Sequence, residues 1–150
     1  MSADYFSFGN RPKTLSEVAL RVGAGEQEFG LAVREFLDSF YLNQSSRNDA
    51  LRERPRSIDA FHDAYFAAVG EHLARTYGLE VPQWTEDHGN GLHEPYFAGG
   101  LESLKAILFV ESPLAFRRRL LFVSRNALTR ASMLAGSEDA AADAAAAVFR

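Results

Sequence analysis

The sequence predicts an all-α protein, a single compact helical domain of about five to six helices with a long loop at residues 79–99 pinned by aromatic rings. Three observations lead to this expectation. Apolar side chains recur three or four residues apart in several segments, as they do on one face of a helix. Capping residues and glycines flank those segments. The 150 residues suit one domain, and neither a repeat nor a shift in composition divides them.

The first predicted helix starts at residue 15, behind a capping box at residues 14–17. In such a box the Thr14 hydroxyl accepts the Glu17 amide while the Glu17 carboxylate reaches back. Glycines at positions 23 and 25 end this helix. A second, amphipathic helix is predicted over residues 26–41, with acidic residues in its first turn. Its apolar stripe consists of Phe29, Val33, Phe36, Leu37 and Phe40.

Residues 43–55 are polar and predict a loop with one weak turn of helix. The most regular pattern of the chain comes next. Ser57 is suited to be its N-cap, the helix extends to Tyr77, and Gly78 is the expected C-terminal stop. Its apolar stripe consists of Ile58, Phe61, Tyr65, Val69 and Leu73.

Residues 79–99 break the helical pattern with two prolines and several glycines. A structureless loop of this length is unusual inside a compact domain. The segment also carries the rings of Trp84, Tyr96 and Phe97, so we expect an ordered loop in which these rings are buried.

The last third predicts shorter helices. Leucines at positions 101, 104 and 108 mark one helix, and Ser112 followed by Pro113 is the start signal of another over residues 113–121. A further helix is predicted over residues 124–133. The run LLFV at residues 120–123 is equally compatible with a short buried strand, because four residues cannot distinguish the two.

Both ends of the chain lie outside the predicted domain of residues 14–133. Residues 1–13 predict an irregular lead-in without the charged and apolar regions of a signal peptide. Residues 134–150 are Ala-rich and predict a frayed tail. No apolar run approaches the roughly 20 residues of a transmembrane helix. Together with the absence of cysteine, this predicts a cytoplasmic protein that has no membrane contact.

Composition also argues against several function classes. The net charge of −4 disfavours non-specific binding of nucleic acid. The chain has no phosphate-binding glycine motif, no GxSxG elbow and no cysteine nucleophile. His88 and His93 lie beside Asp87 and Glu94, but without the spacing of a metal site. We therefore predict no enzyme, no cofactor and no metal site.

The segment 111–130 is an exception to the acidic balance, since five arginines and one glutamate give it a local net charge of +4. Arg117, Arg118 and Arg119 are consecutive, and successive helical residues point about 100° apart, so at most two of them converge. They either pair with acidic groups of the same chain or stay solvated, or they contact a partner or a nucleic acid. Likewise, the three rings of the long loop either pack in the core or anchor another protein. The candidate partner-binding residues are thus Trp84, Tyr96, Phe97, Arg117, Arg118 and Arg119.

Five segments carry a resemblance to a known family: TLSEVALRV, REFLDSFY, DAYFAAVGEHLARTYGLEVPQWT, EPYFAGGLESLKA and ESPLAFRRRLLFVSRNALTRA. Their most specific parts are Pro-x-Trp at residues 82–84, Pro-aromatic-Phe at 95–97 and the Ser-Pro-x-x-Phe-Arg-Arg-Arg run from Ser112. Over residues 15–131 the chain resembles small bacterial proteins that are similar to antitoxin or regulatory partners of nucleotidyltransferase-type toxins. Some members carry an N-terminal helix-turn-helix. Only 13 residues precede the predicted helical region here, too few for such a module.

The function predicted from residues and resemblance together is a non-enzymatic, antitoxin-like protein-binding module. Its partner would be a cognate toxin of the nucleotidyltransferase type, and a homodimer is a further option. The acidic residues Glu26, Glu28, Glu35 and Asp38 are candidate contacts, because an enzyme that binds tRNA or nucleotide presents a positive surface. One alternative is a DNA-associated transcriptional regulator that uses the arginines of residues 117–119. The other is a small all-α, metal-dependent hydrolase or nuclease that uses His88 and His93.

Overall fold

The computed structural model describes residues 10–87, 91–131 and 133, and it confirms the all-α fold class. The described residues form six α-helices: α1 (Leu15–Gly23), α2 (Phe29–Leu42), α3 (Arg47–Arg52), α4 (Ala60–Thr76), α5 (Lys105–Glu111) and α6 (Leu114–Arg117). Three 3₁₀ turns and two very short strands connect them: η3 (Gln44–Ser46), η4 (Gln83–Glu86), η5 (Glu102–Leu104), β1 (Tyr96–Phe97) and β2 (Leu121–Phe122). The predicted lead-in falls mostly, and the predicted tail wholly, outside the described residues. No described helix has both the length and the hydropathy to cross a bilayer.

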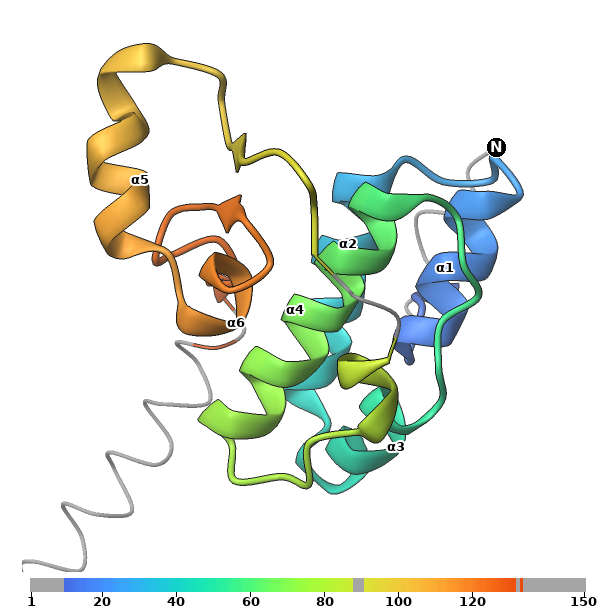
Figure 1. Ribbon diagram of the computed structural model, residues 1–150. Coiled ribbons are helices and arrows are strands. Elements are labelled where there is room, and N and C mark those ends of the chain that lie inside the picture. Colours follow the sequence, from blue (N-terminus) through green and yellow to red (C-terminus); the bar gives the residue numbers. More distant parts are fainter. Residues whose placement is uncertain (1–9, 88–90, 132, 134–150) are drawn as a thin grey trace, which may run out of the picture.

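Helix α4 runs through the middle of the structure, and the other elements surround it (Figure 1). Helices α1 and α2 pack on one another, and α6 and η4 lie directly against α4. Helix α5 stands at the far side of the β1–β2 ribbon, away from the α1–α4 core (Figure 1). Its neighbours are β2 and η5.

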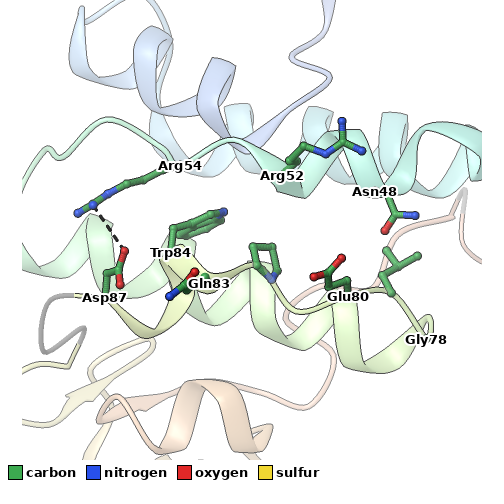
Figure 2. A pocket seen from close by; sticks show the side chains of 10 residues that line it. Asn48, Arg52, Arg54, Gly78, Glu80, Gln83, Trp84 and Asp87 are labelled. Carbon is green, nitrogen blue, oxygen red and sulfur yellow. Dashed lines mark ion pairs between the residues drawn. The ribbon is translucent and has the colours of Figure 1, made fainter.

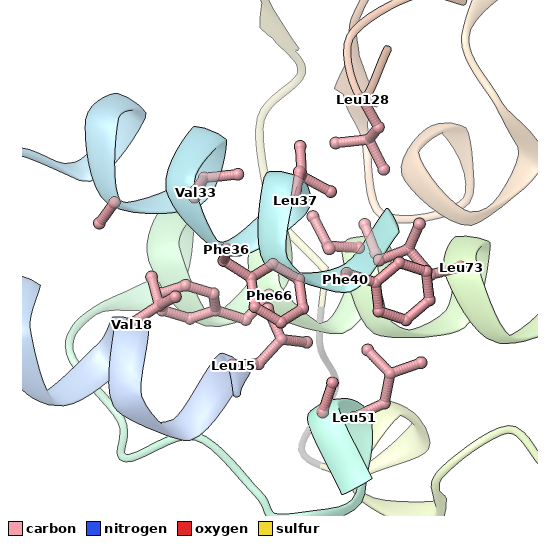
Figure 3. Close-up of a cluster of buried hydrophobic side chains, with 14 of the residues drawn as sticks. Leu15, Val18, Val33, Phe36, Leu37, Phe40, Leu51, Phe66, Leu73 and Leu128 are labelled. Carbon is pink, nitrogen blue, oxygen red and sulfur yellow. The ribbon is translucent and has the colours of Figure 1, made fainter. Parts of the chain in front are cut away.

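The core is a cluster of aromatic and aliphatic side chains between α1, α2 and α4 (Figure 3). Phe36 and Phe40 of α2 and Phe66 of α4 are each no more than 1% exposed. Full burial of such a side chain stabilises a fold by about 1.5–3 kcal/mol. Phe36 and Phe40 belong to the predicted stripe of α2, whereas Phe66 was not in the stripe predicted for α4. Of that stripe Val69 and Leu73 are buried, and Ile58, Phe61 and Tyr65 are only partly buried.

Capping side chains decide where the first two helices begin. The Glu17 amide donates to the Thr14 hydroxyl at 3.0 Å as predicted, but the Glu17 carboxylate accepts the Lys13 amide instead of that of Thr14. Glu28 is the N-cap of α2, because its carboxylate accepts the amides of the second and third helical residues at 2.8 and 2.9 Å. The two bonds keep the pKa of Glu28 below its usual value. Helix α2 therefore begins at Phe29 and not at residue 26, where apolar spacing alone had set it.

The start of α4 also differs from the expectation, while its end agrees. Asp59 is the N-cap, since its carboxylate accepts the His62 amide at 2.9 Å. Ser57 instead donates to Asp63 at 2.5 Å. At the other end Gly78 has a φ of +66°, which glycine adopts without strain, and the next amide bonds back to the Ala74 carbonyl at 2.8 Å.

The polar segment 43–55 contains more helix than the weak turn predicted for it, namely η3 and α3. Two apolar residues of α3, Ala50 and Leu51, are buried in the core. Helix propensity alone does not support a six-residue helix, so this contact with the core stabilises it.

The chain after residue 100 departs most from the predicted helices. Ser112 is the C-cap of α5 and not the N-cap of the next helix, and α6 ends at Arg117. Leu120 takes a φ of +61°, which turns the chain into β2, so the strand alternative for LLFV is the correct one. Strand β2 pairs in parallel with β1, with Tyr96 opposite Leu121. Of the helix predicted over residues 124–133, residues 125–128 form a turn instead, and residues 124, 129 and 130 have no regular structure.

The Ser112 hydroxyl holds this irregular region together. Its Oγ accepts the Val123 amide at 2.8 Å and donates toward the carbonyl oxygens of Leu108, at 2.6 Å, and Val123, at 3.0 Å. The residue is only 3% exposed, so water cannot replace these bonds.

We expect Ser112→Ala to lower the free energy of unfolding by about 1–3 kcal/mol, because it leaves a buried amide without a partner. Urea denaturation measures this loss. The matched control is Ser103→Ala, at an exposed position, which is expected to change stability by less than about 0.5 kcal/mol. Equal midpoints for the two variants would contradict the role given to Ser112.

Candidate functional site

Arg119, one of the predicted partner-binding residues, lies in the interior with 3% of its surface exposed. Its guanidinium donates to the Glu71 carboxylate at 2.6 Å and to the carbonyl oxygens of Ala115 and Thr85, both at 2.7 Å. These contacts join the segment after α6 to α4 and to η4. Arg119 offers no surface to a partner, so pairing within the chain, stated above as an alternative, is what the structure shows for it.

Glu71 is the centre of this cluster. It projects from α4, is 1% exposed, and accepts hydrogen bonds or ion pairs from three arginines, Arg75 at 2.8 Å, Arg118 at 2.9 Å and Arg119. Burial by itself raises the pKa of Glu71. The hydrogen bonds from Arg119 and Arg75 and the charges of Arg119 and Arg118 outweigh burial, so the pKa lies below its usual value and the carboxylate stays ionised.

The three consecutive arginines therefore have three different environments. Arg118 bridges Glu71 and Glu86, and Arg119 converges on the same Glu71 from the buried side. Arg117 is exposed and forms no ion pair within the described residues. The expectation that at most two of them converge is met, and no continuous basic surface results. A DNA-binding role would have to rely on Arg117 without its two neighbours.

The aromatic residues of the long loop divide between packing and exposure. The Trp84 indole N–H donates to the Leu51 carbonyl at 2.9 Å, and the ring lies so close to Gly70 that a Cβ there would approach it to 3.1 Å. Trp84 thus ties η4 to α3 and α4 while staying partly accessible. Tyr96 packs against Phe61 but is 39% exposed.

Phe97 belongs to a column that holds α5 to the β1–β2 ribbon. Its ring stacks on Phe122 with centroids 4.8 Å apart, and Phe109 of α5 stacks on Phe122 at 5.2 Å. The Lys105 ammonium lies 5.2 Å from the centroid of Phe97. Half of the Phe109 surface nevertheless remains exposed, at 57%.

The described residues have ten exposed large apolar side chains, and seven of them lie between residues 96 and 114. We call six of these the α5 face: Leu101, Leu104, Ile107, Phe109, Val110 and Leu114. Their exposed fractions range from 38% to 74%. The sequence did not reveal this surface, because leucines at positions 101, 104 and 108 suggested a buried stripe and only Leu108 is buried.

The four exposed residues of α5, Ala106, Ile107, Phe109 and Val110, carry no formal charge. Ile107 and Val110 are three residues apart and so lie next to one another on the helix surface. The charged residues of this region form ion pairs. Glu102 pairs with Lys105 at 2.7 Å, and Glu111 pairs with Arg125 at 3.1 Å. Exposed apolar side chains gathered in one short segment are a feature of interaction sites.

The acidic candidate contacts are partly used within the chain. Asp38 receives a bidentate pair from Arg130, with both bonds at 3.0 Å, and Glu35 accepts the Gln27 amide at 2.8 Å. Glu28 caps α2, as described above. Of these four carboxylates, only that of Glu26 has neither a hydrogen bond nor an ion pair among the described residues.

The histidines give no support to metal chemistry. His88 lies outside the described residues, and His93 is exposed beside a cavity of about 490 Å³ that Arg118 and Arg119 also line. Over the described part of the chain, no group of three or more His, Cys, Asp or Glu side chains is placed to hold a metal ion. Comparison with protein-family models, with curated proteins and with solved structures found no match for this chain.

We expect Glu71→Gln to destabilise the protein by about 3–5 kcal/mol at neutral pH, because it leaves the buried Arg119 without its counter-charge. The folded-state pKa of Glu71 is depressed below 4.5, so the stability it contributes is present above pH 4.5 and is lost as the pH falls through the folded value. The difference between wild type and variant should therefore shrink on acidification. Urea denaturation at a series of pH values measures it.

The exposed Glu80→Gln is the control for this variant, with unchanged stability expected at every pH. A Glu71→Gln protein as stable as the wild type at pH 7 would show that the buried cluster does not hold α4, η4 and α6 together.

Proposed function

We propose that this protein is a non-enzymatic, antitoxin-like protein-binding module, and that a partner protein docks on the α5 face. The single observation that carries the proposal is the concentration of exposed apolar side chains on and around α5. Monomeric proteins rarely leave such a patch open to water, whereas interfaces are built around one.

The partner we infer has an apolar surface with a carboxylate near its edge. The exposed residues of α5 are uncharged, which suits the desolvated centre of an interface. Arg117 follows Leu114, the last residue of the α5 face, by three positions. It is exposed and forms no ion pair among the described residues. A partner carboxylate would find in it a bidentate donor.

The class of partner rests on the family resemblance, which implies a nucleotidyltransferase-type toxin. An enzyme of this kind binds nucleotide or tRNA with a positive surface. A chain with a net charge of −4 is attracted to such a surface at long range, before apolar contact is made. The net negative charge of the chain would first attract the partner, and the α5 face would then bind it.

The test is co-expression with the product of the adjacent gene, with co-purification and cell growth as the two measurements. We expect a stable complex that relieves toxicity. Co-purification without any toxicity would remove the antitoxin part of the proposal and keep the binding module. A neighbour that neither binds nor harms the cell would overturn the assignment of the toxin partner.

The α5 face itself is tested with the double substitution Ile107→Asn, Val110→Asn in the same co-purification. Each change removes an apolar side chain worth about 1 kcal/mol or more of interface burial, so we expect at least tenfold weaker binding. The matched control is Leu20→Asn, Leu42→Asn. Its exposed fractions of 51% and 60% resemble the 52% and 74% of the tested pair. Equal retention of the partner by both double variants would exclude the α5 face as the docking surface.

A further inference from the structure

A groove of about 760 Å³ lies between α3 with the residues that follow it and the segment from Gly78 to η4 (Figure 2). In Figure 1 this region is on the opposite side of the molecule from α5. The volume is within the range of ligand-binding clefts, which is roughly 300–1,000 Å³. Neither the α5 face nor the Glu71 cluster contributes to it.

The two walls of the groove have opposite charge. Asn48, Arg52 and Arg54 form one wall, and the other carries Glu80, Gln83 and Asp87 (Figure 2). Each wall thus presents two like charges and one amide. A ligand with a single sign of charge is attracted by one wall and repelled by the other, which disfavours nucleotides and other polyanions.

Two ion pairs lie across or beside the groove, and both are too weak to compete with a bound ligand. Arg52 pairs with Asp49 at 2.8 Å, but both side chains are about two-thirds or more exposed. Arg54 is 3.7 Å from Asp87, with both about half exposed. Exposed pairs of this kind contribute about 0–1 kcal/mol, so a ligand can exchange for them at little cost.

The apolar part of the lining is held in place by the fold. Leu79, Pro82 and Trp84 line the groove, and the Trp84 ring is fixed by its bond to the Leu51 carbonyl and by its close approach to Gly70. An aromatic side chain fixed in this way loses little conformational entropy when a ligand covers it.

On the acidic side, the backbone just before η4 is extended and has two N–H groups without a backbone partner in the described part of the chain. Val81 precedes a proline, which restricts it to extended conformations, and Pro82 has a ψ of 137°. Within the described residues, no backbone hydrogen bond uses the N–H groups of Glu80 or Val81. Successive N–H groups of an extended segment lie on opposite edges, so each edge has one donor for a second extended chain.

We propose that this groove binds an extended peptide segment in which acidic and basic side chains alternate. Successive side chains of an extended chain point to opposite sides, so alternation places every carboxylate against Arg52 and Arg54 and every ammonium group against Glu80 and Asp87. The peptide backbone bonds to the one amide of the 80–81 segment on the edge that faces the groove, and its aliphatic side-chain stems cover Trp84. This site does not depend on the α5 face.

Fluorescence titration tests the proposal directly, because Trp84 is the only tryptophan of the chain. The probe is the capped peptide Glu-Lys-Glu-Lys-Glu-Lys, and the control probe is the block isomer Glu-Glu-Glu-Lys-Lys-Lys. We expect the alternating peptide to shift the tryptophan emission and to bind at least tenfold more tightly than the isomer of identical composition. Equal affinity of the two, or no change in emission with either, would overturn the proposal.

Charge reversal tests the walls. Arg52→Glu should weaken binding of the alternating peptide about tenfold, and Arg34→Glu, a reversal at an exposed position outside the groove, should leave it unchanged. Adding Arg54→Glu, Glu80→Lys and Asp87→Lys to Arg52→Glu exchanges the signs of the two walls. Because the alternating peptide can turn over, this quadruple variant should recover most of the lost affinity. Failure to recover, with the urea midpoint unchanged, would contradict recognition by opposed walls.

Discussion

The buried ion pair between Glu71 and Arg119 is the interaction on which the rest of the arrangement depends. A carboxylate and a guanidinium that are both almost fully buried are costly to desolvate, and they persist only when further bonds satisfy them. Here Arg75 and Arg118 also pair with the Glu71 carboxylate, while the Arg119 guanidinium also donates to the Ala115 and Thr85 carbonyls. The Nε group of Arg119 has no hydrogen-bond partner within the described residues, so compensation is not complete. The pair specifies one geometry because any shift of α4, η4 or α6 would leave a buried charge uncovered.

This constraint explains how a chain with little regular structure after residue 78 still has one defined arrangement. Thr85 is fully buried, and its carbonyl is fixed by Arg119, so the long loop is anchored near its middle. Arg119 is followed by the left-handed turn at Leu120, and β2 then pairs with β1 near the end of the same loop. The buried charge pair fixes one end of the segment between η4 and β1, and the pairing of β1 with β2 fixes the other end. Helix α5 lies beyond β1 in the chain, and stacked aromatic rings contribute much of its contact with the ribbon.

The sequence predicted best those elements whose stability comes from an apolar stripe. The core residues Phe36, Phe40 and Leu73 occupy the buried positions that a 3.6-residue period requires, and Gly78 ends α4 where it was expected. The caps were harder, because several nearby side chains can each serve. Asp59 caps α4, although Ser57 two residues earlier was the expected N-cap. Glu28 caps α2, although the helix was expected to begin at residue 26. Local pattern cannot rank such neighbours, since the choice is made by backbone geometry that depends on the packed helices.

The candidate sites were less predictable, for a related reason. Arg119 pairs with a residue 48 positions away and Trp84 bonds to one 33 positions away, and no periodicity encodes a contact of that separation. The α5 face escaped prediction because a single sequence shows which positions are apolar and not which of them find a partner within the chain. The charge pattern of residues 117–119 was informative in one respect only, the angular limit on how many arginines can converge. That limit assumed a helix through all three residues, whereas α6 ends at Arg117, and which arginine is buried depends on where Glu71 lies.

Rigid and exposed features are thus separated in this fold. Side chains that form hydrogen bonds with residues far away in the sequence, such as Trp84 and Arg119, are held in place by the core. The surface next to each of them is therefore rigid as well. Preformed surfaces of this kind lose less entropy on binding than mobile ones. The α5 face, by contrast, is attached through the stacked rings of Phe97, Phe122 and Phe109, contacts worth about 0.5–1.5 kcal/mol each beyond their burial. These rings and the Ser112 hydroxyl hold α5 without contacts to the Glu71–Arg119 pair, so docking at this face need not be transmitted to the groove at Trp84.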